Sequence, residues 1–201
     1  MPESKFGFVD HVVYINLDDR TDRRAEIETE LAPYFPAERV TRFSAIQREM
    51  GAMGATESHI AVLEMAIANQ WTSVLVLEDD AMWGDDFESS YGILETLATK
   101  EHDVVVLGGH NTYWDPGSMK LKWTFGAEGY IVQSHYYSTL LDVFKSSLVE
   151  LKQSNMPWQD GLDVHWNTLV QRDNWFVVRP NLMKQRPGFS DIRKQQIDYH
   201  T

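Results

Sequence analysis

The chain has 201 residues, the length of one ordinary domain, and 43% of them are hydrophobic, so we predict a single globular domain over residues 1–201. Its net charge of −12 opposes nucleic-acid binding, which requires a surplus of Lys and Arg on one face. The absence of Cys excludes disulfides, thiolate metal sites and cysteine nucleophiles. Because the chain also lacks an apolar segment of signal-peptide or membrane-span length, we expect a soluble, cytoplasmic protein.

Apolar, β-branched segments alternate with helix-length segments through the first half of the chain. Strands are predicted at residues 9–17, 40–45, 73–77 and 104–107. The segments between them carry apolar residues at the spacing of one helix face, as at Ile60, Leu63 and Ile67. A loop at 51–54 and a cap at Thr56 are expected before that helix. Strands joined by helices in right-handed crossovers predict an α/β fold with a mostly parallel sheet and helices on both faces.

The second half of the chain is less regular. An aromatic-rich stretch at 123–132 precedes a long helix, which Ser134 is expected to cap and whose apolar face runs from Leu140 to Leu151. Residues 160–170 are predicted to be helical. A strand is predicted at 175–178, and the chain beyond Pro180 is expected to be mostly loop.

Three consecutive carboxylates, Glu78, Asp79 and Asp80, directly follow the predicted strand at 73–77. They repel one another unless a cation or solvent compensates their charge. Mn²⁺ or Mg²⁺ takes oxygen ligands and is commonly held by carboxylates together with the oxygens of a phosphate-bearing substrate. In extended geometry Glu78 and Asp80 point the same way and Asp79 the opposite way, so Glu78 and Asp80 are the predicted metal ligands. The alternative is that the triplet caps the next helix or is merely solvated.

Ligands of parallel sheets bind beyond the carboxyl ends of the strands. This rule places residues 16–20, 78–80 and 108–111 on one rim. An anionic substrate would need a basic patch there, and Arg20, Arg23 and Arg24 are close together in the sequence.

Short motifs occur in a fixed order along residues 9–192. They are Val13-Tyr14-Ile15-Asn16-Leu17 with Arg20, Asp22 and Arg23, then Phe43-Ser44-Ala45, Gly54 with Ser58-His59, and Val76-Leu77-Glu78-Asp79-Asp80-Ala81, followed by Val106-Leu107-Gly108-Gly109, Gly129-Tyr130-Ile131-Val132, Asp163-Val164, Pro180, Gln185 and Ser190-Asp191-Ile192. In this order they resemble the family 25 glycosyltransferases, which include bacterial lipooligosaccharide galactosyltransferases and collagen galactosyltransferases. The chain departs from the family at Asp18-Asp19, where a more basic dipeptide is usual, and at Ala55, where Cys is common.

The resemblance implies a GT-A type fold with a Rossmann-like nucleotide-binding sheet, and inverting transfer from a UDP-sugar with a divalent metal. It matches Glu78 and Asp80 to the DxD-like motif of the family. The substrate-binding residues that we carry over as predictions are Asn16, Arg20, Arg23, His59, Asp79, Gln185 and Ser190.

Inverting transfer is a direct displacement and requires a carboxylate within reach of the acceptor hydroxyl. Asp163, which matches an acidic residue of the family, is the predicted base. Asp191 is the competing base or a further metal ligand, and Asp160 stays open as either an alternative base or a helix cap.

The sequence therefore predicts a metal-dependent glycosyltransferase that moves a hexose, galactose or glucose, from a UDP-sugar to a glycan or glycolipid acceptor such as lipooligosaccharide. One alternative is a catalytically silent nucleotide-sugar or carbohydrate-binding module of the same fold. Another is a metal-dependent phosphohydrolase, although the sequence lacks a recognisable nucleophile motif for that chemistry.

Overall fold

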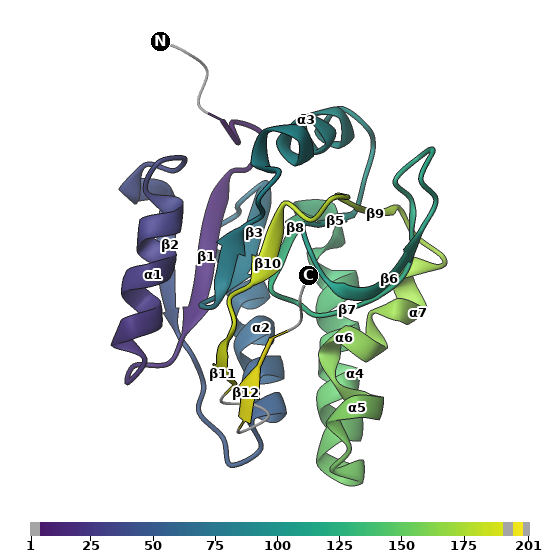
Figure 1. Ribbon diagram of the computed structural model, residues 1–201. Helices are drawn as coiled ribbons and strands as arrows, with labels where there is room; N and C mark the ends of the chain where they lie inside the picture. Colours follow the sequence, from purple (N-terminus) through teal and green to yellow (C-terminus); the bar gives the residue numbers. More distant parts are fainter. Residues whose placement is uncertain (1–4, 191–194, 199–201) are drawn as a thin grey trace.

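A six-stranded sheet with the strand order β2-β1-β3-β8-β5-β9 lies at the centre of the computed structural model, which describes residues 5–190 and 195–198 (Figure 1). Its strands are β1 (His11–Asn16), β2 (Val40–Ser44), β3 (Ser73–Glu78), β5 (Val104–Val106), β8 (Gly129–Gln133) and β9 (Trp175–Val177). Strand β8 is antiparallel to both of its neighbours, and every other pair is parallel. The prediction of a mostly parallel α/β sheet is therefore confirmed.

Helices cover both faces of this sheet, as predicted. Helices α1 (Thr21–Leu31) and α3 (Phe87–Ala98) pack on one face, and α2 (Gly51–Ala68) and α4 (Tyr137–Ser154) pack on the other. Side chains alternate along a strand, so Val74 and Val76 of β3 join the core under α2 and α4, whereas Leu75 and Leu77 join the core under α1 and α3. Burial on both faces explains why β3 is a continuous apolar run.

Three small two-stranded sheets flank the central sheet. They are β4 (Ala81–Trp83) with β10 (Met183–Gln185), β6 (His110–Trp114) with β7 (Leu121–Phe125), and β11 (Gly188–Ser190) with β12 (Gln195–Ile197). The chain beyond Pro180, expected to be mostly loop, thus contains β10, β11 and β12. These strands have three residues each, which is too short for an alternating pattern to appear in the sequence.

Two predicted helix starts were wrong. Residues 51–54, expected to be a loop, form the first turn of α2, and Thr56 lies inside that helix with its hydroxyl bonded to the carbonyl of Ala52. Ser134 begins a short 3₁₀ turn, η2 (Ser134–Tyr136), and does not cap α4 through its side chain. Ile67, expected on the buried face of α2, is 43% exposed.

The predicted helix at 160–170 is instead a series of single turns. They are α5 (Pro157–Asp160), α6 (Leu162–His165) and α7 (Asn167–Val170). Gly161 between the first two has an extended backbone, with ψ of 154°, which interrupts the helix. A further 3₁₀ turn, η1 (Ala37–Arg39), precedes β2. Within residues 5–190 and 195–198, no helix is both long and apolar enough to cross a bilayer.

Candidate active site

A cavity of about 230 Å³ lies at the carboxyl ends of β1 and β3, the edge at which a ligand site was predicted. We call it the carboxylate cavity. Seven of the predicted site residues line it: Arg23, His59, Glu78, Asp79, Asp80, Gln185 and Ser190. They come from separate parts of the chain, including the end of β3, helices α1 and α2, and the C-terminal strands β10 and β11.

All three carboxylates of the acidic triplet line this cavity, so the prediction that Asp79 points away was wrong. Strand β3 ends at Glu78, and the next two residues form a turn in which the alternation of a strand no longer holds. Asp79 accepts hydrogen bonds from Asn16 Nδ2 at 2.8 Å and Arg23 Nη1 at 2.9 Å. The same Arg23 nitrogen lies 3.2 Å from Asp80 Oδ2, so one guanidinium holds two of the carboxylates.

The carboxylates of Glu78 and Asp80 resist ionisation. Burial, together with the negative charge of neighbouring carboxylates, raises the pKa of each group to about 7. Asp80 Oδ1 is buried and has no hydrogen-bond partner among the described residues. Arg23 supplies one positive charge against three carboxylates, so a divalent cation would supply the missing charge.

His59 lies beside the triplet and is 1% exposed. Its Nδ1 shares a hydrogen bond of 2.9 Å with the hydroxyl of Tyr130, and its Nε2 is 3.7 Å from Glu78 Oε1. Burial lowers the pKa of His59 to about 4, so the imidazole is neutral at pH 7. The buried Nε2 finds no hydrogen-bond partner in the part of the chain that the structure describes. A neutral imidazole next to a carboxylate can serve as a metal ligand or bind a polar substrate group.

The N-terminal turn of α2 forms another wall of the carboxylate cavity, with Gly51 and Gly54 in its lining. A Cβ at Gly54 would lie 2.2 Å from the carbonyl oxygen of Ile46, so this turn can approach the preceding segment only because it carries glycine there. Arg48 lies in the same wall and pairs with Glu57 at 2.7 Å. A helix N-terminus with nearby guanidinium groups suits an anion such as a diphosphate.

Two predicted substrate-binding residues, Asn16 and Arg20, are not among the lining residues. Asn16 is buried behind the triplet, where its amide bonds Asp79 and the carbonyl of Arg20, so it positions a carboxylate. The guanidinium of Arg20 pairs with Asp22 at 2.9 Å. Arg42, which the sequence analysis did not single out, donates from Nε to Asn16 Oδ1 at 2.8 Å and orients the amide.

The predicted bases have different placements. Asp163 accepts a hydrogen bond of 2.8 Å from the backbone N–H of Gly126 and does not line the carboxylate cavity, but its charge contributes to the raised pKa of Glu78. Asp160 lies on α5 and bonds Ser154, away from this cavity. Asp191 lies outside the described residues.

Glu128 is a buried acid that the sequence analysis missed. It is 2% exposed, and one carboxylate oxygen accepts the backbone N–H of Gly109 while the other has no hydrogen-bond partner. Burial raises its pKa to about 8, and the charges of Glu78 and Asp80 contribute. Its position immediately before the apolar β8 strand was the available signal, because an acid in such a run needs a reason to be buried.

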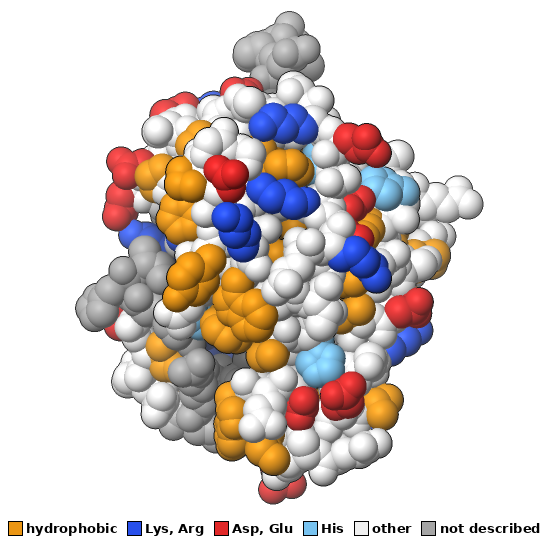
Figure 2. Space-filling view, turned by 90° about the vertical axis from the view of Figure 1, so that its right-hand side faces the viewer, with side chains coloured by type: hydrophobic (Ala, Val, Ile, Leu, Met, Phe, Trp, Pro, Cys, Tyr) orange, Lys and Arg blue, Asp and Glu red, His pale blue; other side chains and the backbone are white. Residues whose placement is uncertain are grey.

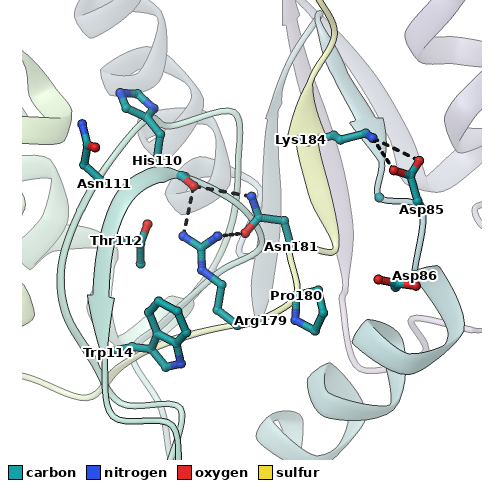
Figure 3. A pocket seen from close by; sticks show the side chains of 12 residues that line it. Asp85, Asp86, His110, Asn111, Thr112, Trp114, Arg179, Pro180, Asn181 and Lys184 are labelled. Atoms are coloured by element: carbon teal, nitrogen blue, oxygen red, sulfur yellow. Dashed lines mark hydrogen bonds and ion pairs between the residues drawn. The ribbon is translucent and has the colours of Figure 1, made fainter. Parts of the chain in front are cut away.

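A second, larger cavity of about 500 Å³ lies between the turn after β4, the start of β6 and the segment before β10 (Figure 3). We call it the Trp114 cavity. Figure 3 shows Arg179 between Trp114 and Asn181, and the guanidinium carbon lies 5.2 Å from the centre of the Trp114 ring. Arg179 Nη2 donates to the carbonyl of Gly109 at 3.0 Å. Gly109 lines the Trp114 cavity and its N–H binds Glu128, whose backbone carbonyl in turn accepts the N–H of Glu78 at the carboxylate cavity.

The face that carries the β6–β7 hairpin and α7 has a mixed surface (Figure 2). Basic side chains gather in its upper half with acidic side chains around them, and hydrophobic side chains lie below. Positive and negative groups thus lie next to one another on this face, unlike the single-sign surface of a nucleic-acid-binding protein.

Solved structures with related folds have low sequence identity to this chain. A mannose-1-phosphate geranyltransferase from Thermus thermophilus is 14% identical with a TM-score of 0.52, and the match covers 85% of this chain and 73% of that one. A glycosyltransferase involved in the glycosylation of the major capsid of PBCV-1 is 9% identical with a TM-score of 0.54, covering 85% and 81%. The apo form of the glycosyltransferase GlyE from Streptococcus pneumoniae is 11% identical with a TM-score of 0.51, covering 85% and 45%.

This likeness establishes the fold, which is of GT-A type as predicted. At such identities it does not extend to the reaction. No protein-family model and no curated protein sequence matches the chain. The resemblance to family 25 therefore stays a prediction.

Proposed function

We propose that this chain is a metal-dependent glycosyltransferase that moves galactose or glucose from a UDP-sugar to a hydroxyl of a glycan or glycolipid acceptor, such as lipooligosaccharide. One observation carries the proposal. Three carboxylates, two of them with a pKa raised to about 7, line a cavity at the end of a central strand of a GT-A type fold, and Arg23 is their one guanidinium partner within residues 5–190 and 195–198. A divalent ion would supply positive charge to these carboxylates and would in turn bind the diphosphate of the donor.

In this proposal Glu78 and Asp80 hold Mn²⁺ or Mg²⁺. The buried, unpartnered Asp80 Oδ1 and the unpartnered His59 Nε2 beside Glu78 are donor atoms that fit such an ion. The ion would neutralise the charge that develops on the departing diphosphate. Asn16 and Arg42 keep Asp79 in place through their hydrogen bonds, so the protein prearranges the site.

The chain's own groups would bind the donor around this position. Arg23 and Arg48, with the first turn of α2, supply positive charge and N–H groups for the diphosphate. Gln185 and Ser190 face the cavity from the C-terminal strands and offer polar side chains to the same ligand.

For the proton transfer, Asp163 remains our proposed base, and Asp191 the competing one. The N–H of Gly126 holds the Asp163 carboxylate near Glu78. Glu128 joins them as a candidate, because a pKa near the working pH suits proton transfer and its second oxygen is unpartnered. The Trp114 cavity is our proposed place for the acceptor, since the consecutive β10 residues Lys184 and Gln185 line the Trp114 cavity and the carboxylate cavity respectively.

The test is turnover of UDP-galactose and UDP-glucose, with and without Mn²⁺, in wild type, Asp80→Asn and Glu78→Gln. We expect metal-stimulated release of UDP that falls by at least about a hundredfold in both variants. The matched control is Asp142→Asn, which removes an exposed carboxylate on α4 that lines neither cavity. Full turnover of Asp80→Asn in metal-free buffer would exclude the proposed role.

The same turnover assay, combined with melting temperatures, distinguishes a transferase from a catalytically silent binding module. In that case UDP with Mn²⁺ should raise the melting temperature of the wild type, because a ligand that binds only the native state stabilises it, while no donor and acceptor pair gives product. Release of phosphate without sugar transfer would identify a phosphohydrolase.

A further inference from the structure

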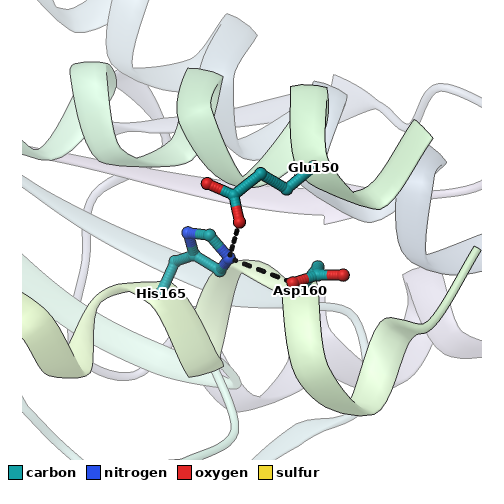
Figure 4. A group of neighbouring side chains, drawn as sticks. All are labelled: Glu150, Asp160 and His165. Carbon is teal, nitrogen blue, oxygen red and sulfur yellow. Dashed lines mark ion pairs between the residues drawn. The ribbon is translucent and has the colours of Figure 1, made fainter. Parts of the chain in front are cut away.

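A second group of potential metal ligands lies outside the carboxylate cavity. Glu150 extends from α4, Asp160 lies at the end of α5, and His165 lies at the end of α6, with all three side chains pointing toward one another (Figure 4). His165 Nε2 is 3.7 Å from Glu150 Oε2 and 3.6 Å from Asp160 Oδ1. The ligand atoms of the three residues all lie within 4.8 Å of one another.

The two distances from His165 are close to the spacing of ligands around zinc. Bonds of roughly 2.0–2.2 Å in a tetrahedron place ligand atoms about 3.4 Å apart, a few tenths of an ångström closer than the two His165 pairs. These two distances are also too long for good direct hydrogen bonds between the imidazole and the carboxylates. An ion among the three ligand atoms would draw both carboxylates toward the imidazole.

The surroundings hold Asp160 on the protein side of the cluster and leave Glu150 on its solvent side, where Ser146 Oγ donates to Glu150 Oε1 at 3.4 Å. Asp160 Oδ2 accepts a hydrogen bond from Ser154 and the Asp160 carbonyl accepts one from Ser147, so Oδ1 is directed at His165. Such outer hydrogen bonds orient metal ligands in proteins. The side chains of Asp160 and His165 are 14% and 16% exposed, whereas that of Glu150 is 54% exposed. The open side leaves a coordination position for water.

We propose that Glu150, Asp160 and His165 form a zinc site that ties α4 to the single-turn helices α5 and α6. Two carboxylates and one neutral imidazole balance the charge of Zn²⁺, and imidazole with carboxylate is a donor set that zinc accepts. The site would fix the position of α6, the helix that also carries Asp163. It is separate from the carboxylate cavity and does not depend on the proposed transferase activity.

Zinc binding to the purified chain tests this proposal, with competition against a chromogenic chelator and with the melting temperature as readouts. We expect wild type and Asp80→Asn to bind zinc at this site and to melt at higher temperature with zinc, since the ion binds the native state. In the Asp80→Asn background, which removes one proposed ligand of the carboxylate cavity, Glu150→Gln and His165→Ala should each weaken zinc binding at least about tenfold and lose the thermal shift. Glu150→Gln keeps the shape of an exposed side chain, so its fold should remain intact.

The control is His135→Ala, which removes an exposed histidine paired with one carboxylate, Asp103, at 2.8 Å. This variant should keep wild-type zinc affinity and thermal shift. X-ray absorption of the zinc-loaded protein should show a single imidazole with oxygen ligands. The proposal is overturned if Glu150→Gln and His165→Ala in the Asp80→Asn background bind zinc as tightly as Asp80→Asn alone, or if wild type shows no zinc-dependent thermal shift.

Discussion

The side chain of Glu128 shows how burial controls a single residue in this protein. Its pKa rises from an ordinary value of 4.5 to about 8, because the folded state disfavours the charged form. The corresponding stabilisation is fully present below pH 4.5 and is lost as the pH rises through 8. We therefore expect the free energy of unfolding in metal-free buffer to fall between pH 5 and pH 9, by up to a few kcal/mol from this residue.

In Glu128→Gln the substituted side chain does not ionise, so the free energy of unfolding should decrease less with rising pH than in wild type. Urea unfolding at several pH values measures this free energy. Glu78 and Asp80 also have raised pKa values, so some slope should remain. Glu101→Gln, at an exposed position, is the matched control and should keep the wild-type slope. If the dependence of the free energy of unfolding on pH is the same in Glu128→Gln as in wild type, then folding does not raise the pKa of Glu128.

A site residue could be predicted from the sequence when it belongs to a local pattern of residues. The acidic triplet directly follows an apolar strand, and this pattern led to a place where Arg23 and His59 also lie. Arg42 carries no such pattern, and the position of Glu128 before an apolar run does not indicate which other residues it lies near. They reach the site because β8 pairs with β3 and β2 pairs with β1, and these pairings join segments far apart in the sequence.

At the scale of elements, the close approach of α2 to the segment before it shapes the carboxylate cavity. Gly54→Ala should destabilise the protein and weaken its thermal stabilisation by UDP with Mn²⁺, because the new Cβ would lie 2.2 Å from the backbone oxygen of Ile46. Ser58 holds the same segment by accepting the N–H of Ile46 at 2.8 Å, so the strain would reach the wall of the cavity.

The control is Gly92→Ala in α3, where an added Cβ meets no atom within 4 Å. This change should stabilise the fold by about 0.5–1 kcal/mol, since Ala favours a helix interior more than Gly does. Melting temperatures of the two variants, measured with and without UDP and Mn²⁺, give the comparison. Equal stabilisation by both substitutions would contradict the described packing of α2.

Long elements were easier to predict than short ones. The strands at 9–17 and 73–77 and the helix from Leu140 to Leu151 have patterns set by burial, and the structure contains all three. The segment predicted as a helix at 160–170 is helical over most of its length, as the single turns α6 and α7, and Gly161 separates it from α5. The position and direction of β8 were also beyond the sequence pattern, since a buried strand has the same composition in either direction.

At the scale of the whole molecule, the proposed reaction uses two cavities, the carboxylate cavity for the sugar donor and the Trp114 cavity for the acceptor. The carboxylate cavity lies at the ends of β1 and β3, and the Trp114 cavity lies next to the β6 strand. The β4–β10 pair contributes to both, through Gln185 in the first and Lys184 in the second. A chain of one GT-A type sheet with short flanking strands can thus offer two adjoining binding regions.

Trp114→Ala should therefore raise KM for the glycan acceptor and leave KM for the UDP-sugar unchanged. Contacts between two aromatic rings are worth about 0.5–1.5 kcal/mol, and a contact of that order between Trp114 and a sugar face corresponds to a roughly two- to tenfold rise in KM. Tyr113→Ala is the matched control, because Tyr113 is the neighbouring aromatic residue on β6, is 67% exposed and does not line the cavity. Steady-state kinetics with each substrate varied in turn separates the two effects. An equal rise in both KM values, or the same effect from Tyr113→Ala, would show that Trp114 acts on the fold and not on the acceptor.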